Sequence, residues 1–369
     1  MAYFYKPPSD DTSVAFIARH YQLIILTHAD EPYALALRQA GYAGPLLQYI
    51  APNEAEGPGP YANHTAPCDR SYPTYQRTVA DRVGVFCQAI HPHEDWFLHN
   101  RQGERLYTRY RSANGVWRTT YLMNPASRGW RQFLLRRMRQ YRGVKLFDGF
   151  FLDNVDLSRV GLLLQPLDRG GLAEYPTEAG YSRAILAELA AIRQAFRPLP
   201  LWANLVHDPN QAGTWSAYLP WLDGVMVEDA GLGWRTAALS LPEQLAQWGN
   251  IRQALAAGKR LLLVVQGARA NDRRRRFGLG MYWALAPAAA GRIYFRYHDA
   301  LASDYRTVWW SPDFDFIPPA ALGPLQCAAA LCRVPYPHGW LQLDWALSDI
   351  RTPAGWWRRP AARTKTAPR

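Results

Sequence analysis

The stretch DGFFLD, Asp148–Asp153, decides the predicted fold, and the stretch DGVMVE, Asp223–Glu228, repeats its pattern. Each is an apolar, strand-like run with a carboxylate at both ends. Side chains on a strand alternate between its two faces, so Asp153 and Glu228 lie on the same face as the glycine of their own run. If the two strands are parallel neighbours, both acids point the same way. Paired carboxylates at strand ends are what glycoside hydrolysis needs.

Short apolar runs alternate with amphipathic stretches on both sides of these two strands, which is typical of βα units around a parallel sheet. Residues 51–73 are expected to form a long loop, and 212–219 is a poorly marked helix. The alternation predicts strands at 23–27, 46–50, 96–100, 147–153, 199–206, 224–228, 260–266 and 292–298, and helices near 31–40, 74–90, 130–141, 185–196, 242–257 and 272–286.

Eight strands in this order predict an α/β fold, a (β/α)8 TIM barrel. A doubly wound open sheet is the alternative, but no glycine-rich phosphate loop follows the first strand. We expect the barrel to occupy 1–305 and a small C-terminal β-rich appendage to occupy 306–350, packed on the barrel. Residues 351–369 are predicted to be a basic, disordered tail.

The composition indicates an ordinary globular chain, with 49% hydrophobic and 20% charged residues. Its 15 Trp, 21 Tyr and 13 Phe suit sugar stacking, although for any single Trp core packing is the better interpretation. The net charge of +12 could attract nucleic acid, a membrane surface or an acidic polymer. No nucleic-acid motif accompanies the arginine run 273–276, so nucleic acid is disfavoured, and most of the charge is interpreted as solvated surface. An anionic glycan is a secondary candidate.

The four cysteines, Cys68, Cys87, Cys327 and Cys332, match no metal-binding or redox spacing and are predicted to be free buried thiols. No leader pattern opens the chain, and no run reaches about 18 apolar residues. We therefore expect a soluble chain without a membrane partner, cytoplasmic as written and extracellular if a leader was removed.

Barrel enzymes place their sites at the carboxyl ends of the strands, and most residues that finish the predicted strands are polar. The two acids Asp153 and Glu228 are the predicted catalytic residues, with an ion pair to Arg296 as the structural alternative. Asp148 and Asp223 begin their strands and are expected to cap or pair at the opposite rim. The predicted substrate-binding residues are Gln48, Tyr49, Asn154, Asp156, Asn204, Gln266, Arg296 and Tyr297.

Neither a metal nor another cofactor is predicted. His207 and Asp208 follow the fifth predicted strand, and His298 and Asp299 follow the eighth, but no HxH or HExxH spacing supports a metal site. No GxSxG elbow is present, so serine-hydrolase chemistry has no support.

The segment FDGFFLDNVD, 147–156, resembles the hypothetical glycosyl hydrolase families related to the endo-α-1,4-polygalactosaminidase group. The segments LLQYI (46–50), WFL (96–98), YLMNPASRGW (121–130) and DGVMVED (223–229) occur in the order expected of that group, so the resemblance covers roughly 15–300. It implies a (β/α)8 barrel that acts on a polysaccharide, with Asp153 and Glu228 at the positions of the strand-end acids.

The sequence thus predicts a glycosidase in which Glu228 is the general acid and Asp153 is the nucleophile or base. Its partner would be a polysaccharide or oligosaccharide, with anionic and amino-sugar polymers among the candidates. The stereochemical outcome stays open, because sequence gives no distance between the acids. The alternatives are a non-catalytic carbohydrate-binding barrel and, less favoured, a nucleic-acid-binding protein that uses the basic runs.

Overall fold

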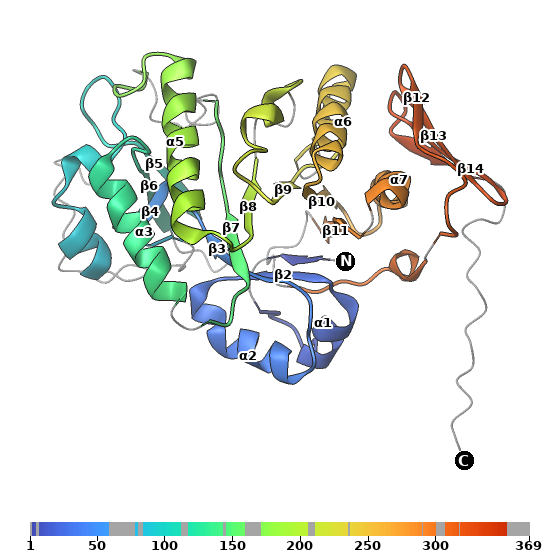
Figure 1. Cartoon of the computed structure of the whole chain (residues 1–369), viewed down its shortest axis with the longest axis horizontal. Coiled ribbons are helices and arrows are strands. Elements are labelled where there is room, and N and C mark those ends of the chain that lie inside the picture. The colour runs from blue at the N-terminus through green and yellow to red at the C-terminus, as the bar shows by residue number, and fades with distance from the viewer. Residues whose placement is uncertain are drawn as a thin grey trace.

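The protein is a (β/α)8 TIM barrel with a small antiparallel sheet at its C-terminus (Figure 1). The computed structural model describes residues 2–4, 7–58, 78–79, 84–111, 117–142, 145–158, 171–205, 211–234, 237–289, 291–299, 307–316 and 318–352. The barrel strands are all parallel and follow one another in chain order: β1 (Ala2–Phe4), β2 (Leu23–Leu26), β3 (Leu46–Ile50), β7 (Gly149–Leu152), β8 (Leu201–Asn204), β9 (Gly224–Val227), β10 (Arg260–Gly267) and β11 (Ile293–Asp299). Because β1 also lies beside β11, the sheet nearly closes on itself.

Helices cover the outside of the barrel, and their ends follow the capping rules. The Thr177 hydroxyl accepts from Gly180 N–H, and Ser240 forms a reciprocal capping box with Glu243. The helices are α1 (Val14–His20), α2 (Glu31–Gln39), α3 (Arg128–Arg142), α5 (Glu178–Phe196), α6 (Leu241–Ala256) and α7 (Asp272–Ala289); shorter turns are η1 (His28–Asp30), η2 (Val85–Ile90), η3 (Glu94–Trp96), η5 (Thr214–Ala217) and η6 (Pro312–Asp315).

Alternating strand residues divide the core into two parts, as the two-residue period of a strand requires. One set packs inside the barrel: Ala2, Leu23, Ile25, Leu47, Tyr49, Phe151, Trp202, Met226, Leu262, Val264 and Tyr294. The other set packs outward, under the helices. The glycines of the two DG motifs allow the strands to approach, because a Cβ on Gly149 would lie 2.3 Å from Pro200 O and one on Gly224 would lie 2.3 Å from the Trp202 indole.

One of the eight predicted strands is wrong. Residues 96–100 form no barrel strand: η3 ends at Trp96, and Phe97 and His99 make isolated bridges to Met123 and Arg105. These residues belong to an excursion after β3 that also contains an antiparallel sheet of β4 (Glu54–Gly57), β6 (Trp117–Leu122) and β5 (Tyr107–Arg111). The true eighth strand is β1, a three-residue segment too short to show periodicity.

Other predicted elements fall partly outside the described residues. The predicted loop 51–73 contains β4, and the rest of it, from residue 59, is not described. Of the predicted helix 74–90, residues 78–79 and 84–90 are described, and they contain η2. The predicted helix near 212–219 is the short turn η5.

Asp148 and Asp223 lie at the rim formed by the amino ends of the strands, opposite the carboxyl ends, as expected. The two aspartates make equivalent contacts. Asp223 Oδ2 accepts from Leu201 N at 2.8 Å and from Arg193 at 2.5 Å. Asp148 Oδ2 likewise accepts from the first residue of β3, Leu46, at 2.8 Å and from an arginine on the preceding helix at 2.7 Å. Each aspartate therefore joins the start of a strand to the end of a helix.

We expect Asp223→Ala to lower the free energy of unfolding by about 2 kcal/mol, because it removes the partner of a largely buried arginine. Asp148→Ala should cost about 1 kcal/mol, since its ion pair is more exposed, with 50% of the Asp148 side chain accessible. Urea unfolding of both variants measures this difference. Equal losses, or a change in kcat/KM at this distance from the strand ends, would contradict the assignment.

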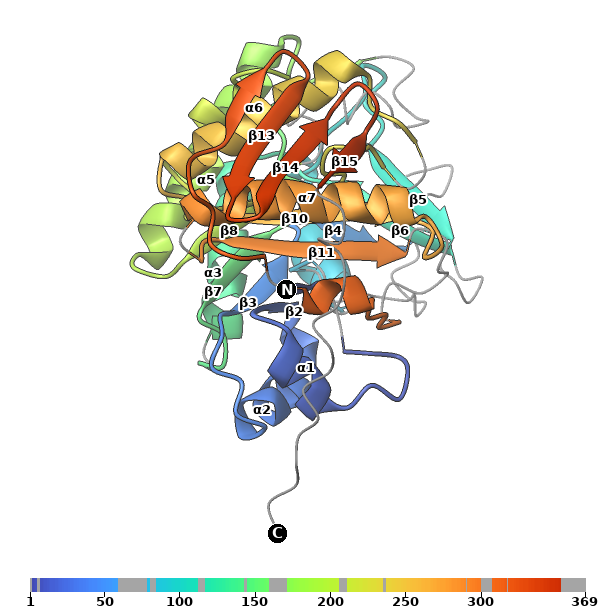
Figure 2. The ribbon, with the colours of Figure 1, turned by 90° about the vertical axis from the view of Figure 1, so that its right-hand side faces the viewer.

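The C-terminal sheet consists of β12 (Gln326–Ala328), β13 (Leu331–Tyr336), β14 (Gly339–Asp344) and β15 (Asp349–Arg351), and Figure 2 shows it lying across α7. Trp345 is buried beneath it against Phe277 and Trp248. The predicted β-rich appendage is therefore confirmed. Its boundaries at 306 and 350 stay predictions, and the predicted tail lies outside the described residues from 353 onward.

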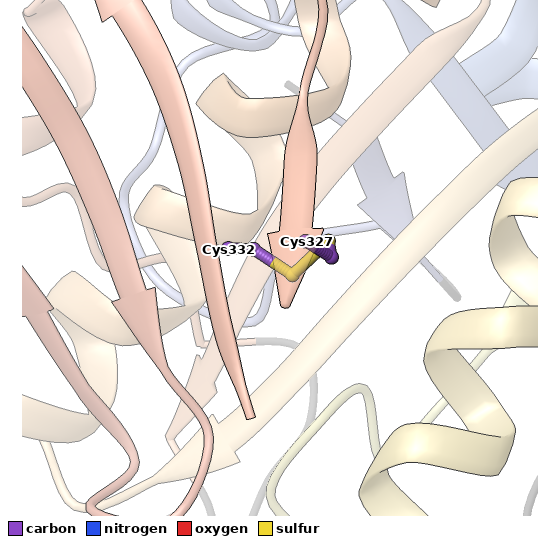
Figure 3. The surroundings of a disulfide bond; sticks show 2 residues. All are labelled: Cys327 and Cys332. Atoms are coloured by element: carbon purple, nitrogen blue, oxygen red, sulfur yellow. A yellow bond between two sulfur atoms is a disulfide. The ribbon is translucent and has the colours of Figure 1, made fainter. Parts of the chain in front are cut away.

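The prediction of free thiols is wrong for Cys87, Cys327 and Cys332, and Cys68 lies outside the described residues. Cys327 and Cys332 form a disulfide between β12 and β13 (Figure 3), and Cys87 is disulfide-bonded as well. The two cysteines of the first bond face each other across an antiparallel pair, a proximity that their five-residue spacing did not reveal.

Among the described residues, no helix is long and apolar enough to cross a membrane.

Candidate active site

Three polar side chains meet at the carboxyl ends of three neighbouring strands. Asp153 follows β7, Asn204 ends β8 and Glu228 follows β9. Each lies two residues beyond an interior residue of its own strand, so the alternation that fills the barrel also directs these three side chains inward. The interior residues that precede them are Phe151, Trp202 and Met226.

Asn204 holds the two acids together. Its Nδ2 donates to Asp153 Oδ1 and to Glu228 Oε2, each at 2.9 Å. Two oxygens that are both 2.9 Å from one nitrogen are at most twice that distance apart, about 5.8 Å. Asn204 is completely buried, and its own Oδ1 has no hydrogen-bond partner among the described residues. The arrangement therefore leaves one acceptor unused beside the paired acids.

Tyr49 contacts the other oxygen of Asp153, to which its hydroxyl donates a hydrogen bond. Asp153 is buried, and both oxygens of its carboxyl group accept hydrogen bonds from protein donors. The structure brings Tyr49 and Asn204, two predicted substrate-binding residues, into direct contact with the predicted catalytic acids.

Glu228 has an unusual electrostatic environment. Burial of its side chain, which is partial by accessible surface, raises the pKa of Glu228 to about 8, and the nearby charge of Asp153 acts in the same direction. The hydrogen bond from Asn204 opposes this rise, as does the positive charge of Arg296. The carboxyl group of Glu228 is therefore largely protonated at neutral pH, and it can donate this proton.

The ion-pair alternative is not supported within the described part of the chain, where neither acid lies within ion-pairing distance of Arg296. Arg296 follows Tyr294 by two residues on β11, so it faces the barrel interior, and His298 continues the same face. Arg296 is buried, and its positive charge acts to lower the pKa of Glu228. It adds positive charge to the same end of the barrel.

Other predicted site residues have different positions. Gln266 Nε2 donates to Glu228 O at 3.0 Å, so it supports the backbone of the acid. Gln48 and Tyr297 are a correction: each is next in sequence to an inward-facing residue and therefore points outward. Gln48 is buried on the helix side, and the Tyr297 hydroxyl donates to Ala268 O at 2.8 Å.

Asn154 and Asp156 lie at the mouth of the barrel, just past β7. Asn154 has a left-handed backbone with φ of 55° and is exposed, and its Nδ2 donates to Glu54 Oε1 at 2.6 Å. It therefore connects the β7 loop to the excursion after β3. Asp156 is partly buried in the same loop. Of the loop residues considered for a metal site, His207 and Asp208 lie outside the described residues.

A raised pKa alone does not identify the site. Burial also raises the pKa of Glu188 to about 8, but this residue lies on the helix α5, away from the barrel interior. What sets Glu228 apart is the second carboxyl group within reach of the same amide.

The arginine run 273–276 is only partly solvated: Arg273 is exposed, Arg274 and Arg276 are partly buried, and Arg275 is buried. Arg274 donates to four backbone carbonyls, and Arg275 is buried, with ion pairs to Asp272 and Asp313. Arg273 donates to Leu347 O. Because Arg274 and Arg275 are bound within the chain, these two charges are not presented to nucleic acid.

Trp234, a residue that is 42% exposed, was not among the predicted site residues. It lies on the loop between β9 and α6, six residues after Glu228. A tryptophan in the glycine-rich segment GLGW, directly after a strand-end acid, is the signal that could have identified it.

The model of hypothetical glycosyl hydrolase family 15 matches residues 61–361, which is most of the chain. The chain belongs to this family. It is therefore a glycosidase, and the predicted enzyme class is confirmed. Membership of hypothetical glycosyl hydrolase family 15 does not name a substrate. No curated protein matches the chain.

Solved structures similar to this family 15 chain include several glycoside-processing enzymes. The glycoside hydrolase domain of PelA from Pseudomonas aeruginosa has a TM-score of 0.49 at 16% identity and covers 82% of this chain and 96% of its own. Ega3 from Aspergillus fumigatus, solved in complex with galactosamine, has a TM-score of 0.42 at 12% identity, with 84% and 92% covered. An α-amylase from Malbranchea cinnamomea has a TM-score of 0.46 at 10% identity, with 90% and 76% covered.

Proposed function

We propose that the protein cleaves a polysaccharide or oligosaccharide with Glu228 as general acid and Asp153 as nucleophile, and that it retains the anomeric configuration. The observation that carries this proposal is the single Asn204 amide group to which both carboxyl groups are bonded. An ordinary structural pair of acids would not be held at one nitrogen beside an unused buried acceptor.

The two acids differ in the way that their roles require. Glu228, with its pKa raised to about 8, holds a proton at neutral pH, while Asp153 accepts hydrogen bonds at both oxygens. Neighbouring titratable groups with different environments take the acid and the nucleophile role in retaining enzymes. This assigns Asp153 as nucleophile in preference to general base.

The distance between the acids supports retention. Retaining glycosidases place their carboxyl groups about 5 to 5.5 Å apart, whereas inverting enzymes need about 6.5 to 9.5 Å to fit a water molecule. The bound of about 5.8 Å between Asp153 Oδ1 and Glu228 Oε2 falls short of the inverting range.

The proposed reaction has two steps. In the first, Glu228 gives its proton to the glycosidic oxygen as that bond breaks, and a carboxylate oxygen of Asp153 forms a bond to the anomeric carbon. In the second, the Glu228 carboxylate takes a proton from water, which attacks the same carbon and releases Asp153. Asn204 stays bonded to both groups, and its free Oδ1 is placed to accept from a sugar hydroxyl.

The substrate is proposed to be a sugar polymer or oligomer whose hydroxyl groups contact the polar rim. Anionic and amino-sugar polymers are both included, because Arg296 adds a positive charge near Glu228 while the acids add negative charge. Asn154, Asp156 and Arg296 remain proposed substrate contacts. Gln48 and Tyr297 do not, since they face away from the barrel interior.

Reducing-end release from a panel of neutral, acidic and amino-sugar polysaccharides tests the proposal. We expect one class to be degraded by the unaltered protein and not by a variant with both Asp153→Asn and Glu228→Gln. Equal product release by both proteins would remove the acids from the mechanism. Glycan binding by both, without release by either, would favour the non-catalytic barrel.

A further inference from the structure

The loop that follows the proposed acid is almost entirely buried except for one aromatic side chain. Residues 230–233 are buried, whereas Trp234 exposes 42% of its surface. Of the two tryptophans that are exposed in the described part of the chain, Trp340 lies on the C-terminal sheet with Arg333 over its ring at 4.8 Å. Trp234 is the one on a βα loop, at the end of the barrel where the acids lie.

Hydrogen bonds hold this loop in place on both sides. Gln247, from α6, accepts from Gly231 N and donates to Asp229 Oδ1 at 3.0 Å. From α7, Arg274 Nη2 donates to Leu232 O at 3.0 Å and to Gly233 O at 2.7 Å. The residue directly before Trp234 is thus bonded to a half-buried guanidinium, so the indole begins from a fixed backbone.

The same guanidinium links the backbone next to Trp234 to the strand end that supports Glu228. Arg274 Nε donates to the backbone carbonyl of Gln266, the residue whose side chain donates to Glu228 O. Arg274 therefore binds both Gly233 and Gln266, which lies at the end of β10. Gln266 in turn donates to the backbone of Glu228. Trp234 is therefore attached to the barrel through the loop that follows Glu228, next to the end of β10.

We propose that Trp234 is a stacking platform for the sugar on the leaving-group side of the cleaved bond. The inference rests on the proposed function, because the general acid must stand next to the leaving oxygen. A partly exposed indole on the loop that follows the acid offers a flat apolar face to the C–H groups of a pyranose ring. Trp234 would bind the departing part of the chain and take no part in proton transfer.

The test compares two substrates that differ in their leaving group. One is the polysaccharide degraded in the panel, and the other is the glycosyl fluoride of its monosaccharide, whose leaving group has no ring to stack. We expect Trp234→Ala to lower kcat/KM on the polymer about tenfold and to change it less than about twofold on the fluoride. Trp234→Phe, which keeps a smaller ring, should lie between Trp234→Ala and the unaltered protein on the polymer.

Trp340→Ala is the matched control, since it removes the other exposed indole far from the acids, and it should behave as the unaltered protein on both substrates. Unchanged melting temperatures would show that neither variant is misfolded. For Trp234→Ala, an equal loss of kcat/KM on the polymer and on the fluoride, or no loss on the polymer, would contradict the stacking role of Trp234.

A failure of the proposed function gives a different result, because it leaves the unaltered protein inactive or leaves the acid variants active. In that event, retardation in polysaccharide-containing native gels measures binding without turnover. Weaker retardation of Trp234→Ala than of Trp340→Ala would support the platform, and equal retardation would overturn it.

Discussion

Asp153→Asn is expected to abolish polysaccharide hydrolysis, with a fall in kcat/KM of at least about 10⁴-fold. The amide cannot form the ester with the anomeric carbon, and it also places an N–H₂ group where Tyr49 or Asn204 now donates. The loss should appear in kcat, because the group acts in the transition state and contributes little to ground-state binding. Reducing-end assays on the substrate found in the panel measure it.

Azide distinguishes a nucleophile from a base at this position. In Asp153→Ala, azide can occupy the vacated space and attack a glycosyl fluoride, which yields a glycosyl azide of inverted configuration. In Glu228→Ala, azide would instead attack the sugar bound to Asp153 and yield the retained configuration. Asp148→Asn, at the other end of the same strand, is the control that should keep full activity. Rescue with the opposite stereochemistry in either variant would reverse the assignment.

Glu228→Gln should lower kcat/KM on the polymer by about 10²- to 10⁴-fold, because the leaving oxygen then departs without a proton. A glycosyl fluoride needs no such proton, so the bond-breaking step on this substrate should be much less affected. Comparable losses on both substrates would indicate that Glu228 positions the substrate and does not act as an acid.

The pH dependence gives an independent signature. Burial and the charge of Asp153 raise the pKa of Glu228 to about 8, so kcat/KM of the unaltered protein should fall as the pH rises through about 8 and the proton is lost. The same raised pKa means that the folded state binds more protons than the unfolded chain between the ordinary value of 4.5 and about 8. Stability should therefore fall over that window in the unaltered protein and fall less in Glu228→Gln, as urea unfolding at several pH values can show.

The central part of the site could be predicted from sequence because strand periodicity fixes it. Once two apolar runs end in acids, alternation places Asp153, Asn204 and Glu228 on the interior face, and the structure agrees. The same rule argues against two of our own predictions. Gln48 is adjacent to Tyr49, and Tyr297 to Arg296, and adjacent strand residues cannot both face inward.

Other features depend on contacts that no local pattern records. The Tyr49 bond to Asp153 joins neighbouring strands, and its partner depends on the stagger between them. The contacts of the arginine run could not be predicted from the sequence. The acceptors of Arg274 are backbone carbonyls of a distant loop, and because every residue type carries the same carbonyl group, no sequence pattern marks them. Residues 96–100 are apolar enough for a strand, yet their bridges are to residues of the same excursion.

The position of β1 has a consequence for how the molecule is made. The first strand of the barrel lies beside its last, β11, which ends at Asp299. During synthesis the growing chain can assemble β2 to β10 next to one another in order, but one side of β1 stays uncovered until nearly 300 residues have emerged. The final closure joins the two barrel strands that are farthest apart in sequence, which predicts a late and slow step in folding. Until β11 comes to lie beside β1, the barrel interior that will hold the two acids is open between these two strands.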